Sequence, residues 1–214
     1  MRSLVLLILL SWGIPAFAAP VLSGRVLGED GKGVADAVVF VQSPVPGEAG
    51  AAAGPHMAAM DQIDKTFVPG LLPITVGTKV KFPNHDQIHH HVYSFSRTKS
   101  FELPLYKGED APPVLFDKVG VVKVGCNIHD WMSGIILVLP TPWFAVTDAQ
   151  GHFALGDLPH GQYTLVVWHE LSKLKPEQTE QSVQVGAANA DLSFTLPLSP
   201  VRARPAVHGT RREP

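Results

Sequence analysis

The chain has 214 residues, of which 45% are hydrophobic and 17% are charged, and its formal net charge is −2. This apolar fraction is sufficient for a packed core, and the length allows one or two domains. A nearly neutral chain is not typical of nucleic-acid-binding proteins, which need a basic surface to neutralise phosphates. The single cysteine, Cys126, excludes an intramolecular disulfide framework.

The first residues are typical of a secretory signal peptide. Arg2 precedes an apolar run over residues 4–10, and Ala-Phe-Ala at residues 16–18 forms a small-x-small cleavage site. The run is shorter than the roughly 20 residues that span a bilayer, and no other segment is long and apolar enough. We therefore predict a signal peptide over residues 1–18, a mature protein in the periplasm, and no stable membrane insertion.

After this segment, turn residues recur about every ten positions, and the segments between them alternate apolar and polar residues. Examples are residues 74–76, 80–82, 122–124, 183–185 and 192–196. Alternation with a period of two indicates half-buried strands, and few stretches have the helical period. The sequence predicts an all-β protein, in which many short strands form sandwiches or barrels.

Two segments of biased composition interrupt this pattern. Residues 43–57 are rich in Pro, Gly and Ala with almost no charge, which is typical of a linker or a long loop. Residues 198–214 have no periodicity and carry four arginines against one glutamate. We expect this end of the chain to be a disordered basic tail.

The chemically informative segment is Cys126-Asn-Ile-His129-Asp-Trp-Met132, which follows a predicted strand. Val122, Val124 and Cys126 share one face of that strand, so the sulfur should point into the core. A thiolate, an imidazole and a thioether spaced three residues apart can surround one metal ion, and soft sulfur with imidazole selects copper or zinc. A structural zinc site would need four Cys or His donors, whereas a thioether is a familiar axial ligand of copper.

Cys126 by itself leaves three roles open in an oxidising compartment: a disulfide to another chain, burial as a small hydrophobic residue, or binding of a metal. Its neighbours favour the metal. A fourth ligand is expected from the segment between Asn84 and Val92, which contains three consecutive histidines. Two His, one Cys and an axial Met make up the trigonal site of blue-copper electron-transfer proteins.

Residues 58–140 resemble the cupredoxins. The spacing Cys-x-x-His-x-x-Met is similar to the short ligand loop of amicyanin. The runs MDQIDKTFVP, HHVYSFS, FELPLY and CNIHDWM resemble plastocyanin-like periplasmic proteins of the methylamine-utilization type. The resemblance implies a Greek-key β-sandwich with one type 1 copper site, whose ligands are His90, Cys126, His129 and Met132.

The choice of His90 comes from the cupredoxin pattern Asn-x5-His-x-Val, which Asn84, His90 and Val92 match. A register slip of one residue in this strand would make His91 the ligand instead. His89 is expected to flank the site at a solvated strand end.

Three further residues receive roles from the same resemblance. Asn84 matches the cupredoxin Asn whose side chain ties the two ligand loops together, and Asn127 is placed to add an amide hydrogen bond near the sulfur. Trp131, inside the loop, has three possible roles: shielding copper from water, presenting an apolar docking face, or packing only.

The remaining sequence resembles a second family. Residues 21–41 resemble the opening hairpin of the transthyretin-like, carboxypeptidase-regulatory-like β-sandwich, and residues 144–168 resemble its later strands and turns. This resemblance predicts one sandwich, made of residues 19–42 and 142–197, that is split by the cupredoxin at 58–140. Domain termini often lie close together, which permits such an insertion. The alternative assigns the first strands to the cupredoxin itself.

The expected function is a one-electron carrier that exchanges electrons with redox partner proteins in the periplasm. The alternative is a module that stores or delivers copper, for which His56, Met57 and Met60 are candidate residues. We expect neither an enzyme nor a small-molecule substrate, because no nucleophile, paired-carboxylate or phosphate-binding motif rises above chance. The second sandwich is expected to act as a scaffold or to bind a partner.

Overall fold

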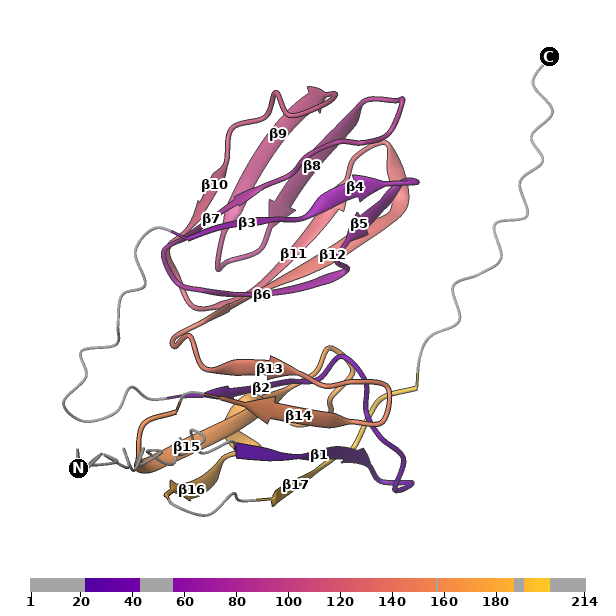
Figure 1. The fold of residues 1–214 in the computed structure, drawn as a ribbon. Coiled ribbons are helices and arrows are strands. Elements are labelled where there is room, and N and C mark those ends of the chain that lie inside the picture. Colours follow the sequence, from indigo (N-terminus) through magenta and orange to yellow (C-terminus); the bar gives the residue numbers. More distant parts are fainter. Residues whose placement is uncertain (1–21, 43–55, 157, 187–190, 201–214) are drawn as a thin grey trace, which may run out of the picture.

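The computed structural model describes residues 22–42, 56–156, 158–186 and 191–200 (Figure 1). The predicted signal peptide, residues 43–55 of the predicted linker and residues 201–214 of the predicted tail lie outside the described residues. The regular secondary structure of the described part consists of strands and one short 3-10 turn, η1 (Pro176–Gln178), which confirms the all-β prediction. It contains no helix with the length and apolar character needed to cross a membrane.

The strands fall into two β-sandwiches that are stacked one above the other (Figure 1). The terminal sandwich contains β1 (Leu22–Gly28), β2 (Val38–Val41), β13 (Phe144–Val146), β14 (His152–Leu155), β15 (Gly161–Trp168), β16 (Gln181–Val185) and β17 (Asp191–Leu196). The central sandwich contains β3 (Met57–Ala59), β4 (Asp61–Ile63), β5 (Thr66–Val68), β6 (Leu71–Thr75), β7 (Thr78–Lys81), β8 (His90–Phe95), β9 (Ser100–Tyr106), β10 (Val114–Phe116), β11 (Gly120–Cys126) and β12 (His129–Leu139).

The terminal sandwich joins segments that are far apart in the sequence. One sheet has the order β14-β1-β17, and the other has the order β13-β2-β15-β16. β1 runs antiparallel to β14 and parallel to β17, with Gly24 opposite Leu192. Gly24 permits this close approach, because a Cβ atom there would lie 2.2 Å from the carbonyl oxygen of Leu192. Within the described residues, neither β1 nor β2 pairs with a strand of the central sandwich.

The central sandwich packs a five-stranded sheet, in the order β6-β12-β11-β8-β9, against the shorter sheet β10-β7-β3 and the β4–β5 hairpin. Its core includes Phe67, Phe82, Phe116 and Ile136. β3 begins at Met57, inside the segment predicted as a linker, because it pairs in parallel with β7. Similarly, Ser199 at the start of the predicted tail donates its backbone N–H to Leu171 O at 2.8 Å.

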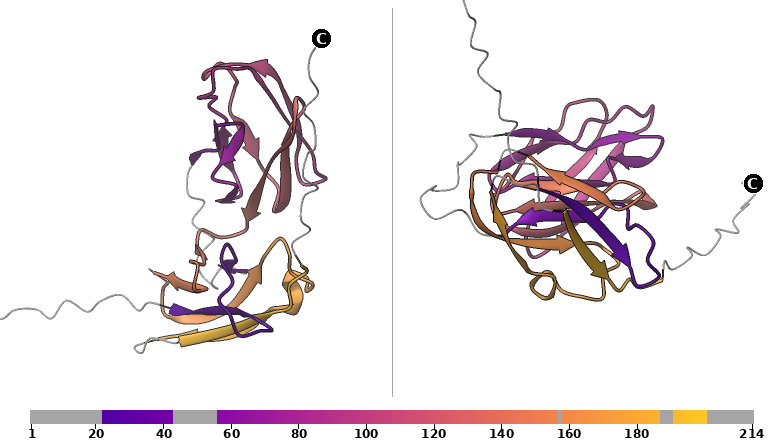
Figure 2. Two further views of the ribbon diagram at one scale, coloured as in Figure 1. Left: turned by 90° about the vertical axis from the view of Figure 1, so that its right-hand side faces the viewer. Right: turned by 60° about the horizontal axis from the view of Figure 1, so that its bottom comes forward.

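A separate apolar cluster joins the two sandwiches. It contains Val38 and Phe40 from β2, Leu137 and Leu139 from β12, and Val166 from β15. All four residues of β2 are buried, because one face of this strand covers the core of the terminal sandwich and the other face covers the junction. The side view in Figure 2 shows the end of the central sandwich resting on the terminal one.

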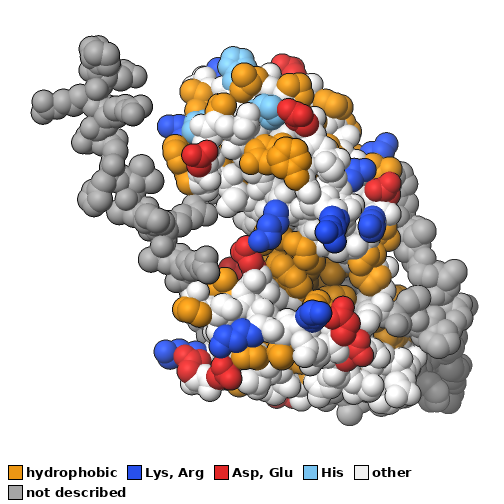
Figure 3. All heavy atoms as spheres, turned by 180° about the vertical axis from the view of Figure 1, so that it is seen from behind, with side chains coloured by type: hydrophobic (Ala, Val, Ile, Leu, Met, Phe, Trp, Pro, Cys, Tyr) orange, Lys and Arg blue, Asp and Glu red, His pale blue; other side chains and the backbone are white. Residues whose placement is uncertain are grey.

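A hollow of about 620 Å³ opens at the junction and is lined by residues of both sandwiches, including Ile135 and Trp168. Lys123 and Glu170 border it and form an ion pair across the junction, with 3.7 Å between Nζ and Oε1. From behind, apolar side chains are visible at the waist of the molecule, with Lys and Arg side chains beside them (Figure 3).

Candidate metal centre

The turn between β11 and β12 brings Cys126 and His129 together. Val122, Val124 and Cys126 are all buried, so the predicted inward phase of this strand is confirmed. After Cys126 a two-residue turn reverses the chain, and His129 becomes the cross-strand partner of Cys126 after a shift in the ladder. The two side chains therefore meet, with 3.6 Å between Cys126 Sγ and His129 Nδ1.

β8 brings a second imidazole to the same sulfur. His90, Val92 and Ser94 point inward along this strand, and Val92 is the cross-strand partner of Cys126. His90 is completely buried, and its Nδ1 lies 3.6 Å from Cys126 Sγ. The ligand atoms of His90, Cys126 and His129 all lie within 4.8 Å of one another.

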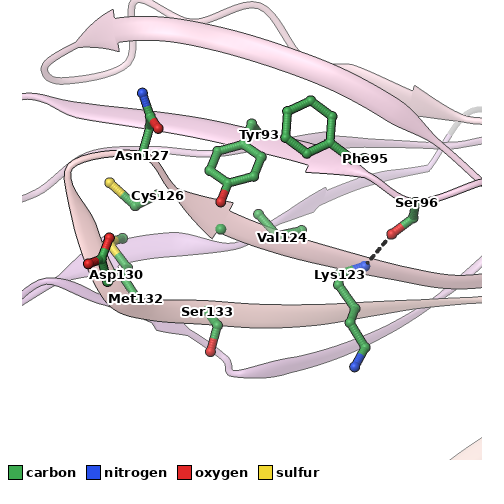
Figure 4. Close-up of a pocket in the computed structure, with 11 residues that line it drawn as sticks. Tyr93, Phe95, Ser96, Lys123, Val124, Cys126, Asn127, Asp130, Met132 and Ser133 are labelled. Atoms are coloured by element: carbon green, nitrogen blue, oxygen red, sulfur yellow. Dashed lines mark hydrogen bonds between the residues drawn. The ribbon is translucent and has the colours of Figure 1, made fainter.

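Met132 is buried in the same core cluster as Cys126. Both residues line a hollow of about 430 Å³ on the flank of the central sandwich, and their sulfur atoms lie at the same end of it (Figure 4). The structure thus collects two imidazole nitrogens, one thiol and one thioether from three segments of the chain. Soft sulfur donors combined with imidazole fit copper, and the thioether does not fit a structural zinc site.

The electrostatics of the two histidines suit metal binding. Burial, together with the neighbouring His90 and Lys65, lowers the pKa of His129 below its ordinary value of 6.5. A neutral imidazole keeps a lone pair for a metal, so His129 is available as a ligand at neutral pH. The other ring nitrogen of His90, Nε2, lies 2.7 Å from Asp86 Oδ2.

The other histidines of the segment point elsewhere. His91 lies on the outer face of β8, where its Nε2 is 2.8 Å from Glu102 Oε1. His89 is exposed. His85 is 3.8 Å from Asp61. Of the three consecutive histidines, the structure places only His90 beside Cys126.

Asn84 is buried, but its hydrogen bonds differ from the predicted ones. Its Nδ2 donates to Ile88 O at 2.9 Å and to Tyr106 O at 3.0 Å, and its Oδ1 accepts from Asp86 N. Among the described residues, Asn84 has no hydrogen bond to the loop between Cys126 and Met132. It instead ties the segment before His90 to the end of β9, because β9 and not that loop lies against its amide.

Asn127 and Trp131 lie in the β11–β12 region as expected. The backbone N–H of Asn127 donates to His91 O at 3.1 Å, which links the turn to β8. Its side chain lines the flank hollow, and within the described residues it makes no hydrogen bond to the Cys126 sulfur. Trp131 is 51% exposed, and its ring centroid lies 5.3 Å from that of His129.

Two features near the site were missed from the sequence. Asp86 contacts His90, and the only signal for it in the sequence is a carboxylate four residues before this histidine. A buried hydrogen-bond cluster also joins β4 to Phe82 and to the end of β9: Gln62 Nε2 donates to Phe82 O at 2.9 Å and to Tyr106 Oη at 2.6 Å. Burial raises the pKa of Tyr106 to about 12, so its hydroxyl stays protonated and donates to Phe82 O.

The flank hollow is bordered by a pair of aromatic rings (Figure 4). Tyr93 and Phe95 are 5.0 Å apart between centroids, and Phe95 is 81% exposed. Tyr93 is the cross-strand partner of Gly125, where a Cβ atom would lie 3.1 Å from the tyrosine ring. The glycine before Cys126 thus leaves room for an aromatic side chain from the neighbouring strand.

Comparison with known proteins gives partial structural matches. No family model and no curated protein matches the chain. A purple cupredoxin from Nitrosopumilus maritimus is 27% identical over 38% of this chain and 98% of its own, with a TM-score of 0.35. A copper-containing nitrite reductase from Thermus scotoductus is 25% identical over 44% of this chain and 25% of its own, with a TM-score of 0.37.

The Cu(I) form of an amicyanin variant is 22% identical over 47% of this chain and 97% of its own, with a TM-score of 0.36. Each of these matches covers less than half of the chain at a TM-score below 0.5. The identity of the metal therefore has to be argued from the donor atoms of the site itself.

Proposed function

We propose that the protein is a type 1 copper protein that carries single electrons in the periplasm. The observation that carries this proposal is the convergence of Cys126 Sγ with the Nδ1 atoms of His90 and His129, with Met132 buried beside them. His90, Cys126 and His129 would hold the copper ion, and Met132 would be its weak axial ligand. Bound copper supplies a one-electron couple between Cu(II) and Cu(I).

The burial of the donors supports a carrier over an enzyme. His90, Cys126 and Met132 are all buried. Together with His129 they make four protein donors, which would leave no open coordination position for a substrate. His129 is partly exposed and lies beside the half-exposed ring of Trp131. We assign the edge of His129 as the point where electrons enter or leave, with Trp131 as an apolar contact for a redox partner.

Storage or delivery of copper is the less favoured alternative. Met57 is 52% exposed and His56 is exposed, but Met60 is completely buried in the core of the central sandwich. The three residues therefore do not form an exposed set of copper donors.

The compartment and the second sandwich are part of the proposal. The periplasmic location depends on the predicted signal peptide, and the redox partners are proteins of the same compartment. We further propose that the terminal sandwich is a transthyretin-like scaffold. In support, its second sheet packs against β12 of the central sandwich through the junction cluster.

Addition of Cu(II) to the purified mature chain tests the copper site. We expect an intense thiolate-to-copper charge-transfer band, with a small copper hyperfine splitting in electron paramagnetic resonance. Cys126→Ala and His90→Ala should abolish the band, whereas His91→Ala should retain it. A colourless protein that binds zinc as tightly as copper would show that the proposal is wrong.

Electron exchange tests the role as a carrier. If the protein shuttles electrons, the copper-loaded form should be reduced and reoxidised by small inorganic redox reagents over repeated cycles without loss of copper. Release of copper to a Cu(I) chelator on each reduction would favour storage or delivery instead.

A further inference from the structure

The tip of the β4–β5 hairpin provides two backbone donors near the metal centre. The hairpin turns at Asp64 and Lys65, and both residues have positive φ angles, of 52° and 56°. Two successive positive φ values are the signature of a tight type I′ turn. In this turn the N–H of Asp64 donates to Asp86 Oδ1 at 2.7 Å, and the N–H of Lys65 donates to Asp86 Oδ2 at 2.9 Å.

The same carboxylate contacts the buried histidine. Asp86 Oδ2 lies 2.7 Å from His90 Nε2, and the backbone N–H of Asp86 donates to Asn84 Oδ1 at 3.0 Å. Both oxygens of Asp86 are thus held by the hairpin, and its backbone is held by a buried asparagine. The carboxylate is fixed in position before it contacts the histidine.

This contact determines which nitrogen of His90 is free. An ionised carboxylate only accepts hydrogen bonds, so the proton of the neutral ring must be on Nε2. The lone pair is then on Nδ1, the atom that lies 3.6 Å from Cys126 Sγ. A carboxylate partner also increases the basicity of a metal-binding imidazole.

We propose that Asp86, held by the turn at Asp64 and Lys65, is a positioning residue for His90. It selects the tautomer with a free Nδ1 and strengthens binding of Cu(II) more than binding of Cu(I). This inference rests on the proposed copper function, because it assigns a property to that site.

Asp86→Asn is the informative substitution. The asparagine side chain has one carbonyl oxygen. It therefore cannot accept hydrogen bonds from both backbone N–H groups of the turn and from His90 Nε2, as the two carboxylate oxygens of Asp86 do. We expect Cu(II) affinity to fall about 10- to 100-fold, as for other partners of metal-binding histidines, and Cu(I) affinity to fall less. The reduction potential should rise, by about 59 mV for each tenfold difference between the two losses. Asp86→Glu should restore part of the Cu(II) affinity.

Asp61→Asn is the matched control. Asp61 lies on β4 of the same hairpin, 3.8 Å from His85. This substitution therefore also removes one negative charge, but it leaves the contact between Asp86 and His90 intact. A second control, Asp64→Asn, keeps both backbone donors and Lys65, and asparagine suits a positive φ angle. Both controls should leave the Cu(II) affinity within a few-fold of the parent protein.

The tautomer of His90 gives a readout that needs no copper. In the apoprotein, nitrogen NMR of the imidazole should show the proton on Nε2, and Asp86→Asn should increase the fraction with the proton on Nδ1. An unchanged tautomer would overturn the proposal, as would equal shifts in potential for Asp86→Asn and Asp61→Asn. Failure of the parent protein to form a blue copper site would refute the proposed function, whereas the tautomer result would still stand.

Discussion

At the scale of single residues, the site combines soft donors with close control of the protonation of its histidines. Cys126 is the last inward residue of β11, and the turn that follows brings His129 to its sulfur. Burial keeps the pKa of His129 low, while Asp86 holds the second histidine through its outer nitrogen. Asp86 itself has a lowered pKa, because the amides of Lys65 and Asp64 and the contact with His90 outweigh the effect of its burial.

Met132→Leu should show whether the Met132 thioether binds copper or the side chain only packs in the core. Leucine fills a similar volume, so the fold should be retained. Since the axial bond is long and weak, we expect copper to remain bound while the reduction potential rises. Met60→Leu is the control, because Met60 is buried in the same core but does not line the flank hollow. Equal potentials for the two variants would mean that Met132 only packs.

Copper affinity should also depend on pH through His129. Protons compete with copper for Nδ1 once the ring becomes protonated, and the pKa of His129 lies below 6.5. Protons therefore do not compete at His129 above pH 6.5, and the apparent affinity should fall more steeply with decreasing pH below that value than above it. Competition titrations at several pH values measure this, and His91→Ala should leave the profile unchanged. The same pH dependence of affinity above and below pH 6.5 would contradict the assignment.

At the scale of elements, alternation along single strands decides which side chains reach the candidate metal site and which reach solvent. On β8, His90 and Val92 face the core, while His91, Tyr93 and Phe95 face outward. The sequence predicted this strand and chose His90 through the cupredoxin pattern, with His91 as the alternative after a slip of one residue. Pairing with β11 resolves the phase, because Val92 lies opposite Cys126. A register is a property of two strands, so one strand alone cannot specify it.

Gly24→Ala tests the pairing of β1 within the terminal sandwich. The new Cβ atom would lie 2.2 Å from the backbone oxygen of Leu192 and 2.8 Å from the Phe153 ring. We expect the free energy of unfolding to fall by roughly 3 kcal/mol, because the backbone of β17 would have to move. Gly156→Ala is the control, since a Cβ atom there has nothing within 4 Å. If Gly24→Ala behaves like the control in denaturant titrations, the pairing of β1 with β17 is wrong.

At the scale of the whole molecule, the two sandwiches share one apolar junction. Ile136 and Val138 of β12 face the central core, whereas Leu137 and Leu139 face β2 and β15 of the terminal sandwich. The same strand therefore belongs to both packing units. This arrangement predicts that the two sandwiches unfold together, because separating them would expose the junction cluster to water.

Leu137→Ala tests this coupling. Truncation of a buried leucine should lower the free energy of unfolding by about 2–5 kcal/mol. Trp143 packs against the core of the terminal sandwich, and Trp168 ends β15. In a Trp131→Phe background, fluorescence of these two residues reports on the terminal sandwich, while the copper band reports on the central one. Both signals should change at the same denaturant concentration, and Leu137→Ala should lower both midpoints. Val119→Ala, at an exposed position, should change neither. A shift in the copper signal alone would show that the sandwiches are independent.

The sequence by itself determined the strand class, the inward phase of Cys126 and the donor types of the site. These follow from local features: a period of two, and donors three residues apart around a tight turn. Only the tertiary structure decided between His90 and His91 and between the two alternatives for the partners of β1 and β2, and it alone placed Asp86 against His90. Those outcomes depend on contacts between segments distant in the chain, and neither residue spacing nor strand propensity encodes which strands will pair.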